Sequence, residues 1–109
     1  MPRSHNDEAP AKYVAEGLWP WCRLRHDAPP SAYFGMLVAR TMYTAMTAAN
    51  ISNRSLGRAA GVAHNTVARI LKGEVLPDID TFSRLEYSLN QSLWAGPDEI
   101  QSCINEHSN

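Results

Sequence analysis

The residues with the clearest potential for chemistry are two cysteine–histidine pairs with the same spacing. Cys22 and His26 lie near the start of the 109-residue sequence, and Cys103 and His107 repeat their three-residue spacer near its end. Brought together, the four side chains would form a tetrahedral site suited to zinc. The spacing differs from that of known zinc fingers, however, and a disulfide between the two cysteines would use the same sulfur atoms. We expect neither, but two buried or idle thiols and no bound metal.

No other group of residues is typical of catalysis. The sequence contains no evident Ser/His/Asp combination, no carboxylate pair in an apolar setting and no glycine-rich loop suited to phosphates. We therefore expect a protein that is not an enzyme and that needs no cofactor.

Charged residues are unevenly distributed along the chain. The formal net charge is −1, but residues 77–109 carry six acidic residues against Arg84 alone, a charge of −5. Residues 1–30 carry four of each sign. Residues 31–76 carry five basic residues against Glu74 alone, a charge of +4; these bases are Arg40, Arg54, Arg58, Arg69 and Lys72. A basic middle beside an acidic end favours a molecule with one face able to approach phosphates.

Length and composition are those of one folded domain. Hydrophobic residues make up 44% and charged residues 19% of the chain, as in ordinary globular proteins. No window approaches the roughly 18 apolar residues of a membrane span, and residues 1–10 lack the apolar core of a secretory signal. We expect a cytoplasmic protein with an N-terminal extension (1–30), a compact domain (31–95) and a short C-terminal helix or tail (96–109).

Apolar periodicity predicts an all-α fold of four to five helices. We expect helices over 31–49 with Ser31 as N-cap, over 53–60, over 63–72, from Pro77 to Asn90, and a short one after Gly96; residues 11–18 could add two helical turns. No alternating strand pattern is visible. The expected core consists of Leu37, Met42, Ile51, Leu56, Ala60, Val62, Val67, Ile70, Leu71, Phe82, Leu85 and Leu89.

The middle of the chain resembles a known family. Residues 50–52 (NIS), 56–62 (LGRAAGV), 66–73 (TVARILKG) and 77–82 (PDIDTF) are similar to the Cro/CI-type, or lambda-repressor-like, helix-turn-helix family. Gly61 supplies the positive φ that favours a tight turn between two helices, and Gly57 is small enough for close helix contact, where the family more often has alanine. Ala63 departs from the family, because it lacks the usual hydroxyl N-cap of the next helix; this loss typically costs about 1 kcal/mol.

The resemblance implies that the helix over 63–72 enters the major groove of double-stranded DNA. Arg69 then offers a bidentate donor pair to guanine and Asn65 one donor and one acceptor to adenine, while Ala68 allows close approach, for example to a thymine methyl. His64 can donate to a base or a phosphate. A phosphate contact or a solvated position remains the alternative for Arg69, and simple exposure the alternative for His64. The expected phosphate contacts are Asn53, Arg54, Ser55, Arg58, Thr66 and Lys72.

The function expected from this resemblance is that of a sequence-specific transcriptional regulator. A repressor that binds an inverted-repeat operator as a homodimer fits best, because one small domain makes too few base contacts alone. One alternative is an antitoxin-type regulator that also binds a protein partner, through Trp19, Trp21 or the acidic C-terminal end. The other is a protein-interaction module that has lost DNA binding. The two tryptophans could also simply pack over the helical domain.

Overall fold

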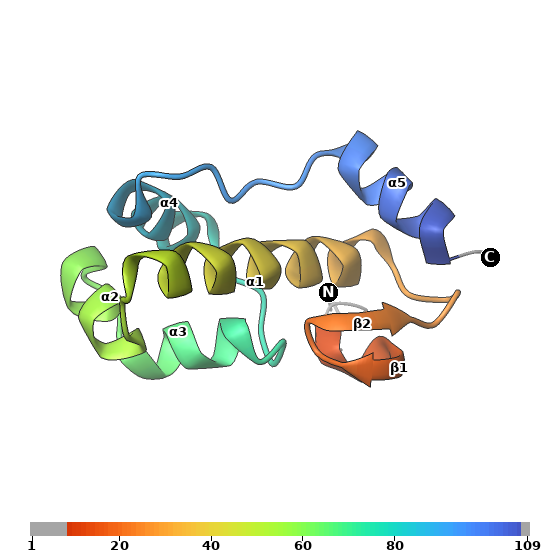
Figure 1. Cartoon of the computed structure of the whole chain (residues 1–109), viewed down its shortest axis with the longest axis horizontal. Helices are drawn as coiled ribbons and strands as arrows, with labels where there is room; N and C mark the ends of the chain where they lie inside the picture. Colours follow the sequence, from red (N-terminus) through yellow and green to blue (C-terminus); the bar gives the residue numbers. More distant parts are fainter. Residues whose placement is uncertain (1–8, 108–109) are drawn as a thin grey trace, which may run out of the picture.

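A computed structural model describes residues 9–107. In Figure 1, the long helix α1 (Pro30–Ala49) crosses the middle of the molecule, with α4 (Ile79–Leu89) and α5 (Pro97–His107) on one side of it, α3 (His64–Leu71) and a hairpin on the other, and α2 (Asn53–Ala60) beside its C-terminal end. In chain order the elements are a 3-10 helix (Pro10–Tyr13), strands β1 (Val14–Leu18) and β2 (Trp21–Leu24), and helices α1 (Pro30–Ala49), α2 (Asn53–Ala60), α3 (His64–Leu71), α4 (Ile79–Leu89) and α5 (Pro97–His107).

The hairpin corrects the all-α expectation. Only the turn at Pro10–Tyr13 is helical in the segment where two helical turns were expected, and residues 14–18 form β1, which pairs with β2 in antiparallel fashion. Glu16 lies opposite Arg23 in this register, and their side chains form an ion pair at 3.1 Å. Cross-strand pairing and packing against the helices override the weak helical periodicity of this segment. The fold is therefore mainly helical with a small two-stranded sheet.

The helix ends follow the sequence signals closely. Ser52 caps α2 by accepting a hydrogen bond from the Ser55 N–H at 3.1 Å. Asn50 and Asn90 end α1 and α4 in the left-handed conformation, with φ of 56° and 52°, as their position after the last apolar residue favours. Ser31 is not the N-cap that was expected. The helix begins one residue earlier, at Pro30, since the fixed φ of proline suits the first helical position.

The hydrophobic core has two clusters that share α1. The first lies between α1, α2, α3 and α4 and contains eight of the twelve expected core residues in buried positions: Met42, Leu56, Ala60, Val67, Ile70, Leu71, Phe82 and Leu85. The second joins the hairpin, the first half of α1 and α5 through Cys22, Leu24, Ala32, Tyr33, Met36 and Cys103.

The second cluster explains why the expected core contains Leu37 but not its buried neighbours Met36 and Val38. Leu37 is only partly buried, whereas its neighbours Met36 and Val38 are both fully buried. Ile51, Val62 and Leu89 are also only partly buried, against the first cluster. Because the hairpin and α5 cover additional faces of α1, this helix is buried on more sides than a single apolar stripe would indicate.

Candidate nucleic-acid interface

The turn between α2 and α3 fixes how these two helices cross. Gly61 has a φ of 72° and its N–H bonds the Gly57 carbonyl, while the Val62 N–H bonds the same carbonyl at 2.8 Å. A Cβ at Gly57 would lie 2.5 Å from the Val62 oxygen and 3.2 Å from the His64 Cα. Such distances exclude a larger side chain unless the backbone moves. In this structure Gly57 thus allows the close helix contact, and Gly61 provides the left-handed turn.

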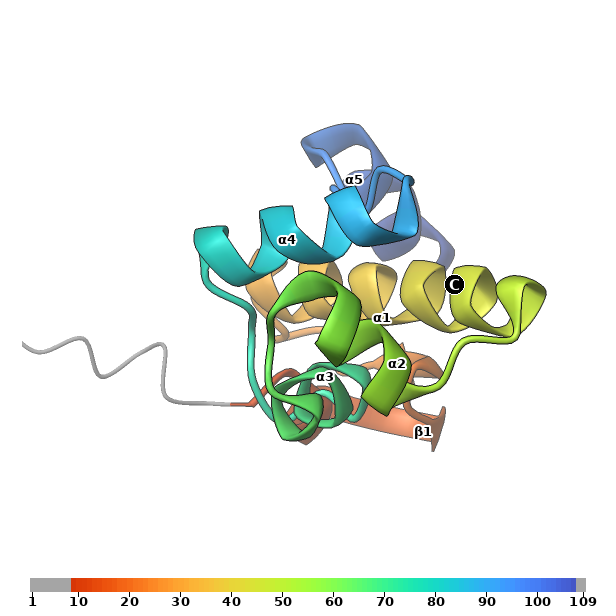
Figure 2. The ribbon, with the colours of Figure 1, turned by 90° about the vertical axis from the view of Figure 1, so that its left-hand side faces the viewer.

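Helix α3 has one buried and one exposed face. Val67, Ile70 and Leu71 are buried in the first cluster, and Figure 2 shows α3 on the opposite side of α1 from α4. Of the expected base-contacting residues, His64, Asn65 and Arg69 are exposed, and Ala68 is half-buried between them in sequence. The structure thus brings the expected polar strip to one surface of a helix whose other side is anchored in the core.

The start of α3 has no side-chain cap. Ala63 occupies the N-cap position with extended backbone (φ −59°, ψ 137°) and makes no capping hydrogen bond. Its methyl group cannot accept from the first amides of the helix, so the sequence-based expectation of a weakened cap is consistent with the geometry.

The residues expected to contact phosphate surround this strip but are not equally available. Arg54, Arg58 and Lys72 are exposed, whereas Asn53 and Thr66 are half-buried. Ser55 is also an expected phosphate contact, but its N–H is bonded to the Ser52 hydroxyl oxygen, and the two hydroxyl oxygens are 3.1 Å apart. The three exposed cations therefore remain the best placed to meet a phosphate.

The C-terminal end of α3 is held by the 3-10 helix and the hairpin. The Trp19 indole Nε1 donates to the Leu71 carbonyl at 3.0 Å, and the Ala11 N–H donates to the Gly73 carbonyl at 2.9 Å. A Cβ at Gly73 would lie 2.5 Å from the Trp19 Cε2 atom, so the ring packs directly on this glycine, whose φ is 74°. Trp19 is half-buried in this position. Of the two roles that the sequence allows for the tryptophans, packing over the domain or binding a partner, Trp19 has the first.

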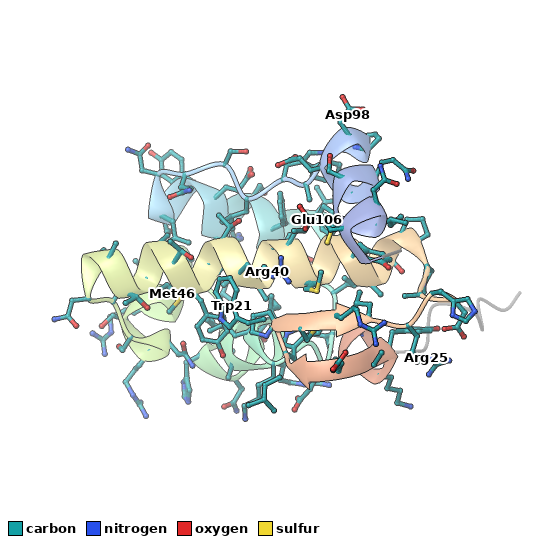
Figure 3. The ribbon with its side chains drawn as sticks, turned by 45° about the vertical axis from the view of Figure 1, so that its right-hand side comes forward. Trp21, Arg25, Arg40, Met46, Asp98 and Glu106 are labelled. Carbon is teal, nitrogen blue, oxygen red and sulfur yellow. The ribbon has the colours of Figure 1, made fainter. Side chains whose placement is uncertain are left out.

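Trp21 lies differently, although it is only two residues away. Its side chain is 59% exposed, and the Arg40 guanidinium lies 5.4 Å from its ring centroid. Figure 3 shows both residues between α1 and the hairpin. Arg40 also donates to the carbonyls of Pro20 (2.8 Å) and Cys22 (3.2 Å). This arginine, expected only as part of the basic middle, therefore attaches the hairpin to α1.

An ion pair at the end of α3 was not anticipated from the sequence. Arg69 Nε lies 3.4 Å from Glu74 Oε1, and both side chains are about half exposed, at 58% and 51%. One sequence feature points to this ion pair: Glu74 is the single acidic residue among the five basic residues of 31–76.

The geometry of α2 and α3 agrees with a match to a known family. Residues 42–93 match the family model described as Helix-turn-helix. This match supports the similarity of the middle of the chain to the Cro/CI-type helix-turn-helix family. The matched residues include the last eight residues of α1 together with α2, α3 and α4. The family is one of DNA-binding regulators, so the match supports a DNA-binding regulator in general terms. No significant match was found among curated proteins or solved structures.

Of the two cysteine–histidine pairs outside the helix-turn-helix, the structure describes the side chains of Cys22, His26 and Cys103. Cys22 and Cys103 are both buried in the second cluster without a disulfide between them. Burial raises the pKa of both thiols, which makes them poorer nucleophiles and metal ligands at neutral pH. No group of three potential metal ligands occurs in the part of the chain that the structure describes, and the side chain of His107 lies outside the described residues.

None of the helices described in the structure combines the length and the apolar character needed to cross a membrane.

Proposed function

We propose that the protein is a transcriptional repressor that recognises a specific double-stranded DNA sequence through α3 and binds an inverted repeat as a homodimer. The observation that carries this proposal is the exposed face of α3. It presents His64, Asn65 and Arg69 on a helix whose other face is fixed in the core. In a helix-turn-helix domain, this helix is the one that enters the major groove.

Each residue of this face has a role that its chemistry supports. The Arg69 guanidinium can donate two hydrogen bonds to the O6 and N7 atoms of a guanine, and the Asn65 amide can pair with the N6 and N7 atoms of an adenine. His64, in the first turn, can donate to a base or to a phosphate. Ala68 has no side chain beyond Cβ, so it lets the helix approach the base edges closely, for instance at a thymine methyl.

Phosphate contacts on either side would set the register of the helix in the groove. Arg54 and Arg58 on α2 and Lys72 at the end of α3 supply exposed positive charge, and the side chains of Asn53, Ser55 and Thr66 can add hydrogen bonds. Six of the acidic residues lie in residues 77–109. In Figure 3, Asp98 on α5 lies on the side of the molecule away from α3. This separation of charge would orient the protein as it approaches DNA.

A homodimer follows from the small number of base contacts that one domain can make. A single recognition helix with four candidate base contacts gives limited specificity, and a two-fold axis doubles that number. Dimers of helix-turn-helix proteins bind half-sites about 34 Å apart, one turn of the double helix. A bound operator is therefore expected to be palindromic, and repression would result from occlusion of a promoter.

Selection of bound sequences from random DNA tests this proposal most directly. The expected result is an enriched palindrome whose affinity falls steeply as salt rises, because phosphate contacts release counterions. The variant Arg69→Ala should lose about 1–3 kcal/mol of binding free energy and relax the base preference at one position of each half-site. Arg23→Ala, which removes an ion-paired arginine from the hairpin, is the matched control and should leave that base preference unchanged. If no sequence is enriched, or if both variants behave alike, α3 is not the recognition helix.

A further inference from the structure

Glu74 places a negative charge beside the surface that is proposed to approach DNA. It is the single acidic residue among residues 31–76, and it lies three residues after the last residue of α3, with its side chain 51% exposed. A carboxylate near the phosphates repels them and reduces affinity for any DNA sequence. Its position next to the recognition helix therefore needs an explanation other than general attraction to DNA.

The backbone at the end of α3 fixes where this carboxylate lies. Gly73 takes the left-handed conformation with a φ of 74°, and the Glu74 N–H then donates to the Arg69 carbonyl at 2.9 Å. This is the hydrogen bond that closes a Schellman motif at a helix C-terminus. The Trp19 ring packs on Gly73 and holds the same turn from outside. Glu74 is thus placed by the helix ending and not by a flexible loop.

The side chains of the same two residues also meet. Glu74 Oε1 lies 3.4 Å from Arg69 Nε, so the carboxylate lies beside the inner nitrogen of the guanidinium. A guanidinium has a fixed fork of five N–H donors. When a carboxylate lies at Nε, the outer edge formed by the two Nη atoms is left available for another partner. That outer edge can form a bidentate contact with the O6 and N7 atoms of guanine.

We infer that Glu74 is a specificity-determining positioning residue, which holds the Arg69 guanidinium with its outer edge toward a guanine. This inference rests on the proposed function, in which α3 contacts base edges. Glu74 acts through Arg69 and makes no base contact of its own.

Removal of the Glu74 carboxylate should affect the affinity for DNA and the specificity for guanine in opposite directions. Removing the carboxylate reduces repulsion of phosphates, so binding to unrelated DNA should be equal or tighter. It also frees the Arg69 side chain to meet phosphates or other bases, so the preference for guanine should fall. Specificity is a difference between two affinities, and it should decrease in a variant that binds DNA in general no less strongly.

The experiment compares Glu74→Gln, Arg69→Ala and the double variant with the wild-type protein. Dissociation constants are measured for the selected operator, for operators with each other base at the Arg69-dependent position, and for unrelated DNA. Glu16→Gln is the matched control, because it removes the same side chain from an exposed ion pair with Arg23 in the hairpin. We expect Glu74→Gln to lower the guanine preference about 3- to 10-fold, a typical size for coupling between contacting side chains. Glu16→Gln should not change the preference. In the Arg69→Ala background, Glu74→Gln should not change it further.

Two results would overturn the inference. One is an unchanged guanine preference in Glu74→Gln. The other is an equal change in the presence and absence of Arg69, which would mean that Glu74 contacts a base directly. Failure of the proposed function would look different, because the wild-type protein would then select no DNA sequence at all.

Discussion

Replacing Trp19 with phenylalanine should destabilise the domain by loosening the contact between the hairpin and the end of α3. The indole Nε1 donates to the Leu71 carbonyl at 3.0 Å, and the ring packs on Gly73. Phenylalanine has no N–H to donate and a smaller ring, so it loses the hydrogen bond and part of the packing while keeping an aromatic side chain in place.

The size of the effect follows from these two losses. A net hydrogen bond contributes about 1 kcal/mol to the free energy of unfolding. The smaller ring leaves roughly 40 Å² of apolar surface uncovered, which adds about 1 kcal/mol. A total of about 2 kcal/mol corresponds to a fall in Tm of roughly 8 °C for a domain of about 100 residues.

Trp21 provides a matched control on the same hairpin. Its ring is 59% exposed, and phenylalanine would keep an aromatic face beside Arg40. Trp21→Phe should therefore change the free energy of unfolding by less than about 0.5 kcal/mol. Urea unfolding followed by circular dichroism, with both variants at the same protein concentration, measures the difference. Equal destabilisation by the two substitutions, or a larger effect of Trp21→Phe, would refute the role given to the Trp19 contact.

Three further predictions concern the helix-turn-helix and α4. Gly57→Ala should lower Tm and weaken DNA binding, although alanine favours helix, because its Cβ would lie 2.5 Å from the Val62 oxygen; an unchanged Tm would contradict this steric reason. Ala63→Ser should stabilise the protein by about 1 kcal/mol by supplying the missing N-cap, and a fall in Tm would argue against it. The hydrogen bond from the Thr81 N–H lowers the pKa of Asp78, so this carboxylate contributes stability above about pH 4 that is lost as the pH falls through its folded-state pKa. Asp78→Asn, which keeps a capping oxygen, should therefore make the decline in Tm below pH 4 shallower, as thermal melts at pH 2 to 5 would show.

The helices of the central domain could be predicted from the sequence because their signals are local. Ser52 and Asp78 lie at helix starts as caps, and Asn50, Gly61 and Asn90 lie where positive φ is needed. Such residues act within a few positions of their own location, so no knowledge of distant contacts is required. The exposed strip on α3 could be predicted for the same reason, since it lies between apolar residues at helical spacing.

The hairpin could not be predicted because its stability depends on distant residues. β1 has hardly any alternation, since four of its five residues are exposed. β2 alternates only over four residues, and the exposed Trp21 hides that pattern. What holds the strands in place is contact with Arg40, Leu71 and Gly73, which lie far along the chain. The Arg69–Glu74 ion pair could not be predicted from the sequence for a related reason. It depends on the left-handed turn at Gly73, whose effect on side-chain direction is not visible in residue spacing.

Because α1 belongs to both core clusters, the segment that can contact DNA is shorter than the segment that folds as one domain. The family match begins at Met42, in the middle of α1. A fragment cut there would keep every candidate base contact but would divide a continuous helix. It would also remove the hairpin that holds the end of α3. Transfer of this DNA-binding motif to another protein would therefore need the chain from the hairpin onward. The hairpin stabilises the end of α3, although it lies outside the residues that match the family.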